Sequence, residues 1–140
     1  TEQLYSKTHS GFLLGSLLNN TNLLYEARYP LNKNDFKPFI VHEIIFVCIC
    51  KLADNGAQNI DAKEIAEFLK AYPEQENKLI NELSNGDYIG YINTLKTLDN
   101  DKAYWVDGDE DLSIKDIGNY DYILGNKMRW KFVMKEEHDW

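Results

Sequence analysis

The sequence FKPFIVHEIIFVCICKLADNG, residues 36–56, contains the longest apolar run of the chain. Its large apolar residues recur at spacings of one, three and four, which is typical of a buried helix. Gly56 stands where the left-handed conformation that ends many helices is needed. His42 and Glu43 interrupt the run, which is also shorter than the ~20 apolar residues that span a bilayer. We therefore predict a long helix at the centre of the core, which begins at Phe36 and ends before Gly56.

Two shorter helices are expected before this stretch. Apolar residues at helical spacings predict a short buried helix over residues 12–18. Thr21 can cap a second short helix over residues 22–28, which Pro30 stops. Residues 32–35 are expected to form a turn before the central helix.

Three further helices are expected after it. Asp61 and Glu64 have the spacing of a capping box, in which each side chain accepts a hydrogen bond from a free backbone amide. They predict a helix over residues 62–71. A proline just before residues 74–83 can open another helix, because proline is favoured in a first turn. Asp87 begins a sixth helical segment.

The chain after residue 98 divides into an acidic and a basic part. Residues 99–116 hold seven acidic residues and two lysines without helical periodicity, so we expect an exposed acidic loop. Within it, the Tyr-Trp-Val sequence at 104–106 can form a short strand. Apolar residues predict a last long helix over 117–136, and residues 127–135 make it basic.

These elements define an all-α fold class, because no part of the chain alternates with a period of two for long enough to build a sheet. We expect a globular helical subdomain over residues 1–86. A carboxy-terminal helical hairpin is expected over residues 87–140, with the acidic loop between its helices. No internal repeat is apparent.

The composition fits one domain and disfavours one class of partner, nucleic acid. The chain has 140 residues, 44% of them hydrophobic, which is enough to bury a core. Its net charge is −8, and residues 71–140 hold eight basic against fifteen acidic residues. Binding to phosphates requires a concentration of lysine and arginine. DNA is therefore not expected to be the main partner, and the basic residues of 127–135 are interpreted as a solvated face.

The two cysteines indicate a reducing compartment rather than a site. Cys48 and Cys50 lie inside the apolar stretch, and a disulfide scaffold is excluded by their number. Two positions apart on a helix, their side chains point about 200° apart and cannot share a metal ion. We interpret them as small buried hydrophobes of a cytoplasmic protein, with no visible signal peptide.

No catalytic or metal-binding set emerges from the sequence. Asp107, Asp109 and Asp111 resemble the start of a calcium loop, but Leu112 and Gly118 occupy the positions that require glycine and glutamate. A metal-dependent nuclease that uses Asp107, Asp109 and Glu110 is a poor alternative, because these residues lie in an expected loop. The phosphate-binding loop GxxxxGK[ST] does not occur. We expect no catalytic residue, no cofactor and no metal.

Several short motifs follow one another in a characteristic order. They are Leu13-Leu14-Gly15, Asn34-Asp35-Phe36, His42-Glu43-Ile44-Ile45-Phe46, Asn55-Gly56 and Ile60-Asp61. Together they resemble the amino-terminal domain of DnaB-type replicative DNA helicases, over about residues 10–95 and 116–136. The acidic residue usual ahead of "LLG" is absent and the hairpin turn is expanded into the acidic loop. These differences favour a divergent member, of phage or mobile-element origin.

The resemblance implies a function without chemistry. In that family the amino-terminal domain packs into a collar on one face of the hexameric ring, helps to set ring assembly and offers a surface to primase or a helicase loader. It also implies a longer protein with a motor domain absent from this sequence. The alternative is a free-standing acidic helical adaptor or DNA mimic. A reading frame that continues beyond residue 140 into a phosphate-binding loop distinguishes the two.

Interface candidates come from the expected last helix. Its apolar residues lie on several faces, and two packed helices cannot cover them all, so we expect a homo-oligomer formed through the hairpin. Trp130 lies about 70° from the main apolar direction, between Arg129 and Lys131. The candidates for burial against a partner are Tyr120, Leu124, Met128, Trp130 and Phe132.

Overall fold

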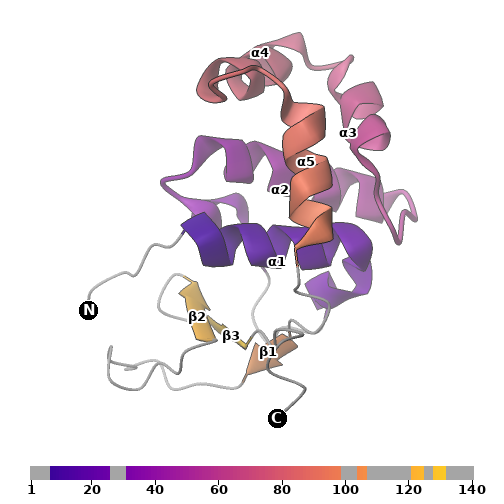
Figure 1. Ribbon diagram of the computed structural model, residues 1–140. Helices are drawn as coiled ribbons and strands as arrows, with labels where there is room; N and C mark the ends of the chain where they lie inside the picture. The colour runs from indigo at the N-terminus through magenta and orange to yellow at the C-terminus, as the bar shows by residue number, and fades with distance from the viewer. Residues whose placement is uncertain (1–6, 26–30, 99–103, 107–120, 125–127, 132–140) are drawn as a thin grey trace.

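The computed structural model describes residues 7–25, 31–98, 104–106, 121–124 and 128–131 (Figure 1). The helices are α1 (Lys7–Asn19), α2 (Ile40–Asp54), α3 (Ala62–Leu69), α4 (Pro73–Glu82) and α5 (Tyr88–Thr97), with the 3-10 helices η1 (Thr21–Tyr25) and η2 (Lys33–Phe36). The strands are β1 (Tyr104–Val106), β2 (Asp121–Leu124) and β3 (Met128–Lys131). The all-α prediction is confirmed for the helical unit, residues 7–98. Among the described helices, none has the length and apolarity that a bilayer crossing requires.

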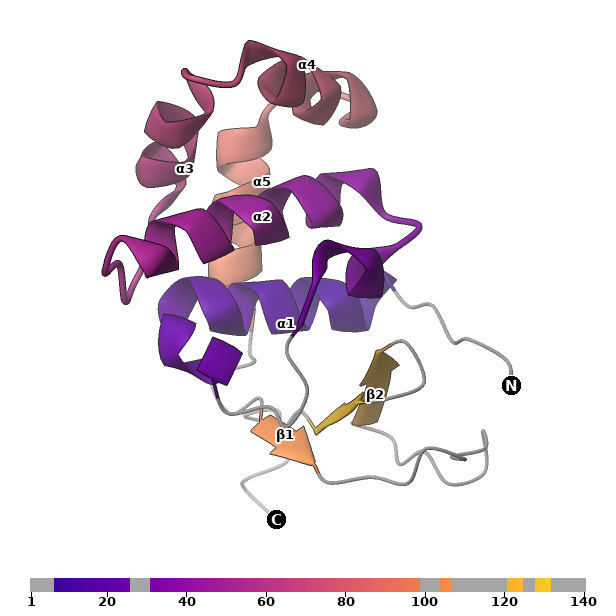
Figure 2. The ribbon, with the colours of Figure 1, turned by 180° about the vertical axis from the view of Figure 1, so that it is seen from behind.

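The helix α2 is the centre of this unit. It lies beside α1, and α5 crosses both helices (Figures 1 and 2). α3 and α4 pack on the side of α2 that faces away from α1. Ile45 and Ile49 of α2 are completely buried in one cluster with Leu13 and Leu17 of α1 and Ile92 of α5. Burying each such side chain contributes about 1.5–3 kcal/mol. The predicted central helix is therefore confirmed.

The start of α2 differs from the prediction by four residues. Pro38 has no amide hydrogen to join a helical ladder, and the helix begins only at Ile40. The Lys37–Pro38 peptide bond is cis. The residues before it form η2, where the Asp35 carboxylate accepts a hydrogen bond from the Asn32 amide at 2.9 Å. The expected turn at 32–35 is thus a capped 3-10 turn.

Local helix signals behaved as the sequence predicts. Gly56 has a φ of 97°, in the left-handed region that favours glycine. The Glu64 amide donates to the Asp61 carboxylate at 2.9 Å, and the Asp61 amide donates to the Glu64 carboxylate at 3.4 Å. Asp87 caps α5 by accepting from the Gly90 amide at 2.9 Å. Each cap satisfies a backbone donor that has no partner inside its helix.

The second predicted helix is a short 3-10 turn in its described part, and Thr21 has another role. The Thr21 hydroxyl donates to the carbonyl of Ala57 at 2.7 Å. The Ile60 amide donates to the carbonyl of Leu18 at 2.8 Å. The end of α1 is therefore tied to the loop between α2 and α3, which competes with a regular helix here. Residues 26–28 of the prediction lie outside the described residues.

The helix α5 belongs to the same core as α1. Ile92 and Leu95 are buried in the common hydrophobic cluster. A side chain added at Gly11 would place its first carbon 3.1 Å from Leu95 Cδ2, so the two helices approach closely at that glycine. The predicted start of the carboxy-terminal hairpin, residue 87, lies inside this helical unit.

A cluster of hydrogen bonds holds the end of α5. The Lys96 ammonium donates to Asn59 Oδ1 at 2.8 Å and to the carbonyl of Ile60 at 2.7 Å. The Asn19 side-chain amide donates to the carbonyl of Lys96 at 3.1 Å. The last turn of α5 is thus joined to the end of α1 and to the loop between α2 and α3.

Three short strands follow the helical unit. The middle strand, β3, pairs antiparallel with both others, in the order β1-β3-β2. Trp130 is opposite Trp105 on one side and Tyr122 on the other. The short strand expected at 104–106 is confirmed. The rest of the expected acidic loop, 99–103 and 107–116, lies outside the described residues.

The long helix predicted over 117–136 is wrong where the structure describes it, because residues 121–124 and 128–131 are strands. Gly118 and Gly125 each cost a helix up to about 1 kcal/mol relative to alanine. Aromatic and β-branched residues near them favour strands, and antiparallel neighbours supply backbone partners that a lone helix lacks. At the residues that the structure describes, strands therefore replace the second helix of the predicted hairpin.

Candidate functional site

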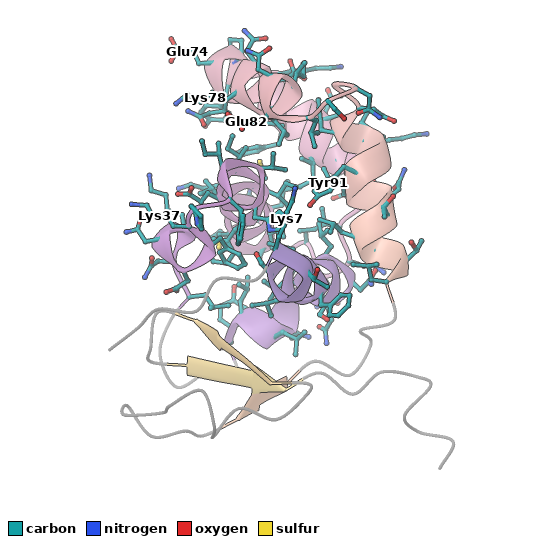
Figure 3. The ribbon with its side chains drawn as sticks, turned by 60° about the vertical axis from the view of Figure 1, so that its left-hand side comes forward. Lys7, Lys37, Glu74, Lys78, Glu82 and Tyr91 are labelled. Atoms are coloured by element: carbon teal, nitrogen blue, oxygen red, sulfur yellow. The ribbon has the colours of Figure 1, made fainter. Side chains whose placement is uncertain are left out.

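Three hydrogen-bonded side chains join α1, α2 and α5: Ser10 and His42 are buried, and Tyr91 is half-buried. Ser10 Oγ lies 2.7 Å from His42 Nδ1, and His42 Nε2 lies 2.6 Å from the hydroxyl oxygen of Tyr91. Tyr91 points from α5 toward α2, and Lys7 lies at the start of α1 on the same side (Figure 3). Burial lowers the pKa of His42 from 6.5 to about 4, and the charge of Lys7 acts in the same direction. The neutral imidazole has one donor and one acceptor nitrogen, and each is matched by a hydroxyl.

The three side chains Ser10, His42 and Tyr91 have a structural role. A nucleophilic serine must reach a substrate, whereas Ser10 and His42 have no exposed surface. His42 belongs to one of the family motifs in the sequence, but neither of its hydrogen-bond partners was predicted. Ser10 and Tyr91 are 32 and 49 positions away from His42, and no local pattern connects them.

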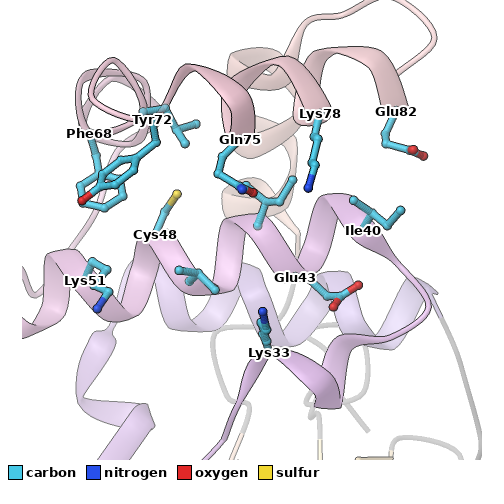
Figure 4. A pocket seen from close by; sticks show the side chains of 13 residues that line it. Lys33, Ile40, Glu43, Cys48, Lys51, Phe68, Tyr72, Gln75, Lys78 and Glu82 are labelled. Carbon is cyan, nitrogen blue, oxygen red and sulfur yellow. The ribbon is translucent and has the colours of Figure 1, made fainter.

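An open groove lies between α2 and α4, with η2 and the end of α3 at its sides (Figure 4). Its volume is about 630 Å³. Its apolar lining consists of Ile40, Ile44, Val47, Cys48, Phe68 and Leu69, and Tyr72 adds an aromatic ring. We name the part beside Phe68 and Tyr72 the aromatic end and the opposite part the Ile40 end.

Large apolar side chains in the groove are open to solvent. Ile40 is 43% exposed, Val47 36% and Tyr72 51%. The rings of Phe68 and Tyr72 pack with centroids 5.1 Å apart. Because α2 is apolar around most of its circumference, contacts with α1 cover one face and leave this one incompletely covered.

Five charged residues line the same groove. Lys51 lies at the aromatic end, Glu43 and Glu82 lie at the Ile40 end, and Lys33 and Lys78 lie between them (Figure 4). Within the described part of the chain, the ion pair that forms is Lys70–Glu67, and none of the five charged groove residues takes part in one. The groove therefore has a basic and an acidic end, whose charges are not paired with one another.

A hydrogen bond holds the α4 wall of the groove. The Tyr88 hydroxyl donates to the Glu76 carboxylate at 2.6 Å and joins α5 to α4. Burial, followed by the contact with Glu76, raises the pKa of Tyr88. Leu79 of α4 is completely buried in the core. The wall is therefore anchored from both its apolar and its polar side.

The thiols do not make this groove a reactive site. Burial raises the pKa of Cys48 to about 12 and that of Cys50 to about 11, with Asp54 adding to the second effect. Nucleophilic attack and metal binding require the thiolate, which is scarce at neutral pH under these conditions. Among the residues that the structure describes, no three potential ligands gather as a metal site.

The predicted interface residues are distributed differently from the single helix on which they were grouped. Leu124 ends β2 and is opposite Met128 of β3, and Trp130 lies in the middle of β3. Tyr120 and Phe132 lie outside the described residues. The helical spacing that set Trp130 apart therefore no longer applies, and the role of these residues stays a prediction. The groove between α2 and α4 was not foreseen.

The described helices share one apolar core, and a groove between α2 and α4 is open at its surface. The family model for the DnaB-like helicase N terminal domain matches residues 3–104. The chain belongs to this family, which confirms the resemblance seen in the sequence. The match covers the first predicted range, whereas residues 116–136 lie beyond it. No curated protein and no solved structure matches significantly.

The family places the described helices in a replicative helicase. The match includes every helix from α1 to α5 and therefore the whole groove. The amino-terminal domain of DnaB is non-catalytic and has a role in helicase assembly. This agrees with the structural role of the hydrogen bonds that join Ser10, His42 and Tyr91.

Proposed function

We propose that this chain is a non-catalytic assembly and protein-interaction domain of a hexameric replicative DNA helicase, which packs into the collar of the ring and contacts primase or a helicase loader. The family match over residues 3–104 carries this proposal. The groove supports it, because contiguous apolar surface rimmed by charges is typical of a protein-binding site.

The partners follow from the same role. Ring assembly requires contacts between copies, and we assign part of them to the segment after residue 98, with Trp130 and Met128 as the first candidates. The net charge of −8 disfavours DNA as the main partner. A replicative helicase of this kind works in the cytoplasm, and no cofactor is required by a domain that only binds proteins.

The test uses the full-length protein. The reading frame is sequenced beyond residue 140, and the complete protein is compared with a deletion that lacks residues 1–104. We expect the deletion to form less stable hexamers in sedimentation experiments and to lose binding to the primase or loader of the same genome. A deletion that assembles and binds both proteins as well as the complete protein contradicts the proposal.

One observation favours a second function. Most of the negative charge lies in residues 71–140, as expected of an acidic adaptor or DNA mimic. A reading frame that stops after residue 140, together with binding of the purified chain to a DNA-binding protein, would favour this alternative.

A further inference from the structure

The groove between α2 and α4 has the dimensions of a docked helix. Ile40, Ile44, Val47 and Lys51 line it at spacings of four, three and four, so they form one stripe along α2. This stripe is ~16 Å long, or about three helical turns, at 1.5 Å per residue. The walls are helices, which bond their backbone groups internally and offer no sheet edge to an extended peptide. A helix is therefore the matching occupant.

The charges of the groove specify that helix further. Lys51 marks the aromatic end and Lys33 and Lys78 the middle, whereas Glu43 and Glu82 mark the Ile40 end (Figure 4). α2 and α4 run in opposite directions along the groove, so Glu43 near the start of α2 faces the end of α4, where Glu82 lies. A bound helix with one acidic and one basic end matches this arrangement in a single orientation.

We propose that the groove binds one amphipathic helix of a partner protein, about three turns long, with its acidic end beside Lys51 and its basic end beside Glu43 and Glu82. Its apolar residues, spaced by four and three, contact Val47 and its neighbours on α2. This inference rests on the proposed interaction function and names the chemistry of the partner.

The test uses synthetic helical peptides and the complete 140-residue chain labelled with nitrogen-15. The probe is about three turns long. It carries leucines at spacings of four and three, glutamates in its first turn, lysines in its last turn, as the helix dipole favours, and a nitroxide at the acidic end. The control peptide has the same composition with the charges alternating along its polar face. We expect saturable binding of the probe and line broadening at Phe68 and Tyr72 rather than at Ile40.

Two variants separate the groove from the rest of the surface. Val47→Glu places a charge on the apolar lining and should weaken probe binding about tenfold or more. Ile89→Glu is the matched control, because Ile89 is 38% exposed, Val47 is 36% exposed, and Ile89 lies on α5 outside the groove. It should bind as the wild type does. Circular dichroism checks the folding of both variants.

A charge exchange tests the orientation. The double variant Lys51→Glu with Glu82→Lys should weaken binding of the probe about tenfold and shift the broadening toward Ile40. The inference is overturned if the probe does not bind, if both peptides bind equally, or if Val47→Glu binds as the wild type does. It is also overturned if Val47→Glu abolishes a wild-type dimer that the probe cannot displace, since a second copy is then the occupant. Each failure leaves the hexamer assay of the full-length protein unaffected, so the two proposals fail separately.

Discussion

The buried histidine of α2 should make the stability of this domain depend on pH. His42 has a pKa of about 4 in the folded protein and about 6.5 when exposed in the unfolded chain. The unfolded state therefore binds more protons between these values. The contribution of His42 to the free energy of unfolding is complete above pH 6.5 and is lost as the pH falls toward 4.

The magnitude follows from the two values. A tenfold change in an acid dissociation constant corresponds to about 1.4 kcal/mol, so the whole effect amounts to about 3 kcal/mol. Between about pH 7.5 and pH 5 the loss is about 2 kcal/mol, because the folded histidine is still neutral at the lower limit. Most carboxylates are also still ionised there, which keeps their contribution small.

Urea unfolding at a series of pH values measures this loss. His42→Gln is the control, because glutamine keeps polar atoms near Ser10 and Tyr91 but does not titrate. We expect the midpoint of the wild type to fall more steeply with decreasing pH than that of the variant, at an unchanged denaturant slope. Titration of the wild-type imidazole by NMR gives a second measurement. Parallel pH profiles, or an imidazole midpoint near 6.5, would refute the reasoning.

The remaining predictions concern single side chains. Tyr91→Phe leaves a nitrogen of His42 without its hydroxyl partner and should lower the free energy of unfolding by about 1–3 kcal/mol, measured in urea. Asp61→Ala removes the acceptor of the Glu64 amide and should cost about 1 kcal/mol in the same assay. Trp130→Glu should weaken self-association about tenfold or more across a sedimentation concentration series; a folded variant that associates like the wild type excludes this residue from the interface.

Local signals were sufficient to predict the α-helices that the structure describes in the matched domain, but not the 3-10 turn η1. Asp61 and Glu64 lie three positions apart and complete their capping box without help from other segments. Gly56 and Asp87 likewise act on the backbone next to them. The class of the helical unit was predictable because such signals and the apolar spacing of α2 agree.

Features that depend on distant segments were not predictable in the same way. Ser10 and Tyr91 meet His42 only after three helices have packed, and the groove forms only where α4 packs beside α2. After residue 98 the apolar spacing suited a helix, but it contained no information about strand partners. The pairing of Trp130 with Trp105 shows that a neighbour 25 positions away competed with the local helical preference.

The hydrogen bonds around Lys96 affect how a force on the chain after α5 acts on the domain. Any segment attached after Leu98 leaves from a turn that is fastened to the end of α1 and to the loop between α2 and α3. A pull on that segment is therefore shared by three elements instead of unwinding α5 alone. A rotation of that segment about the last turn of α5 would first have to break these hydrogen bonds.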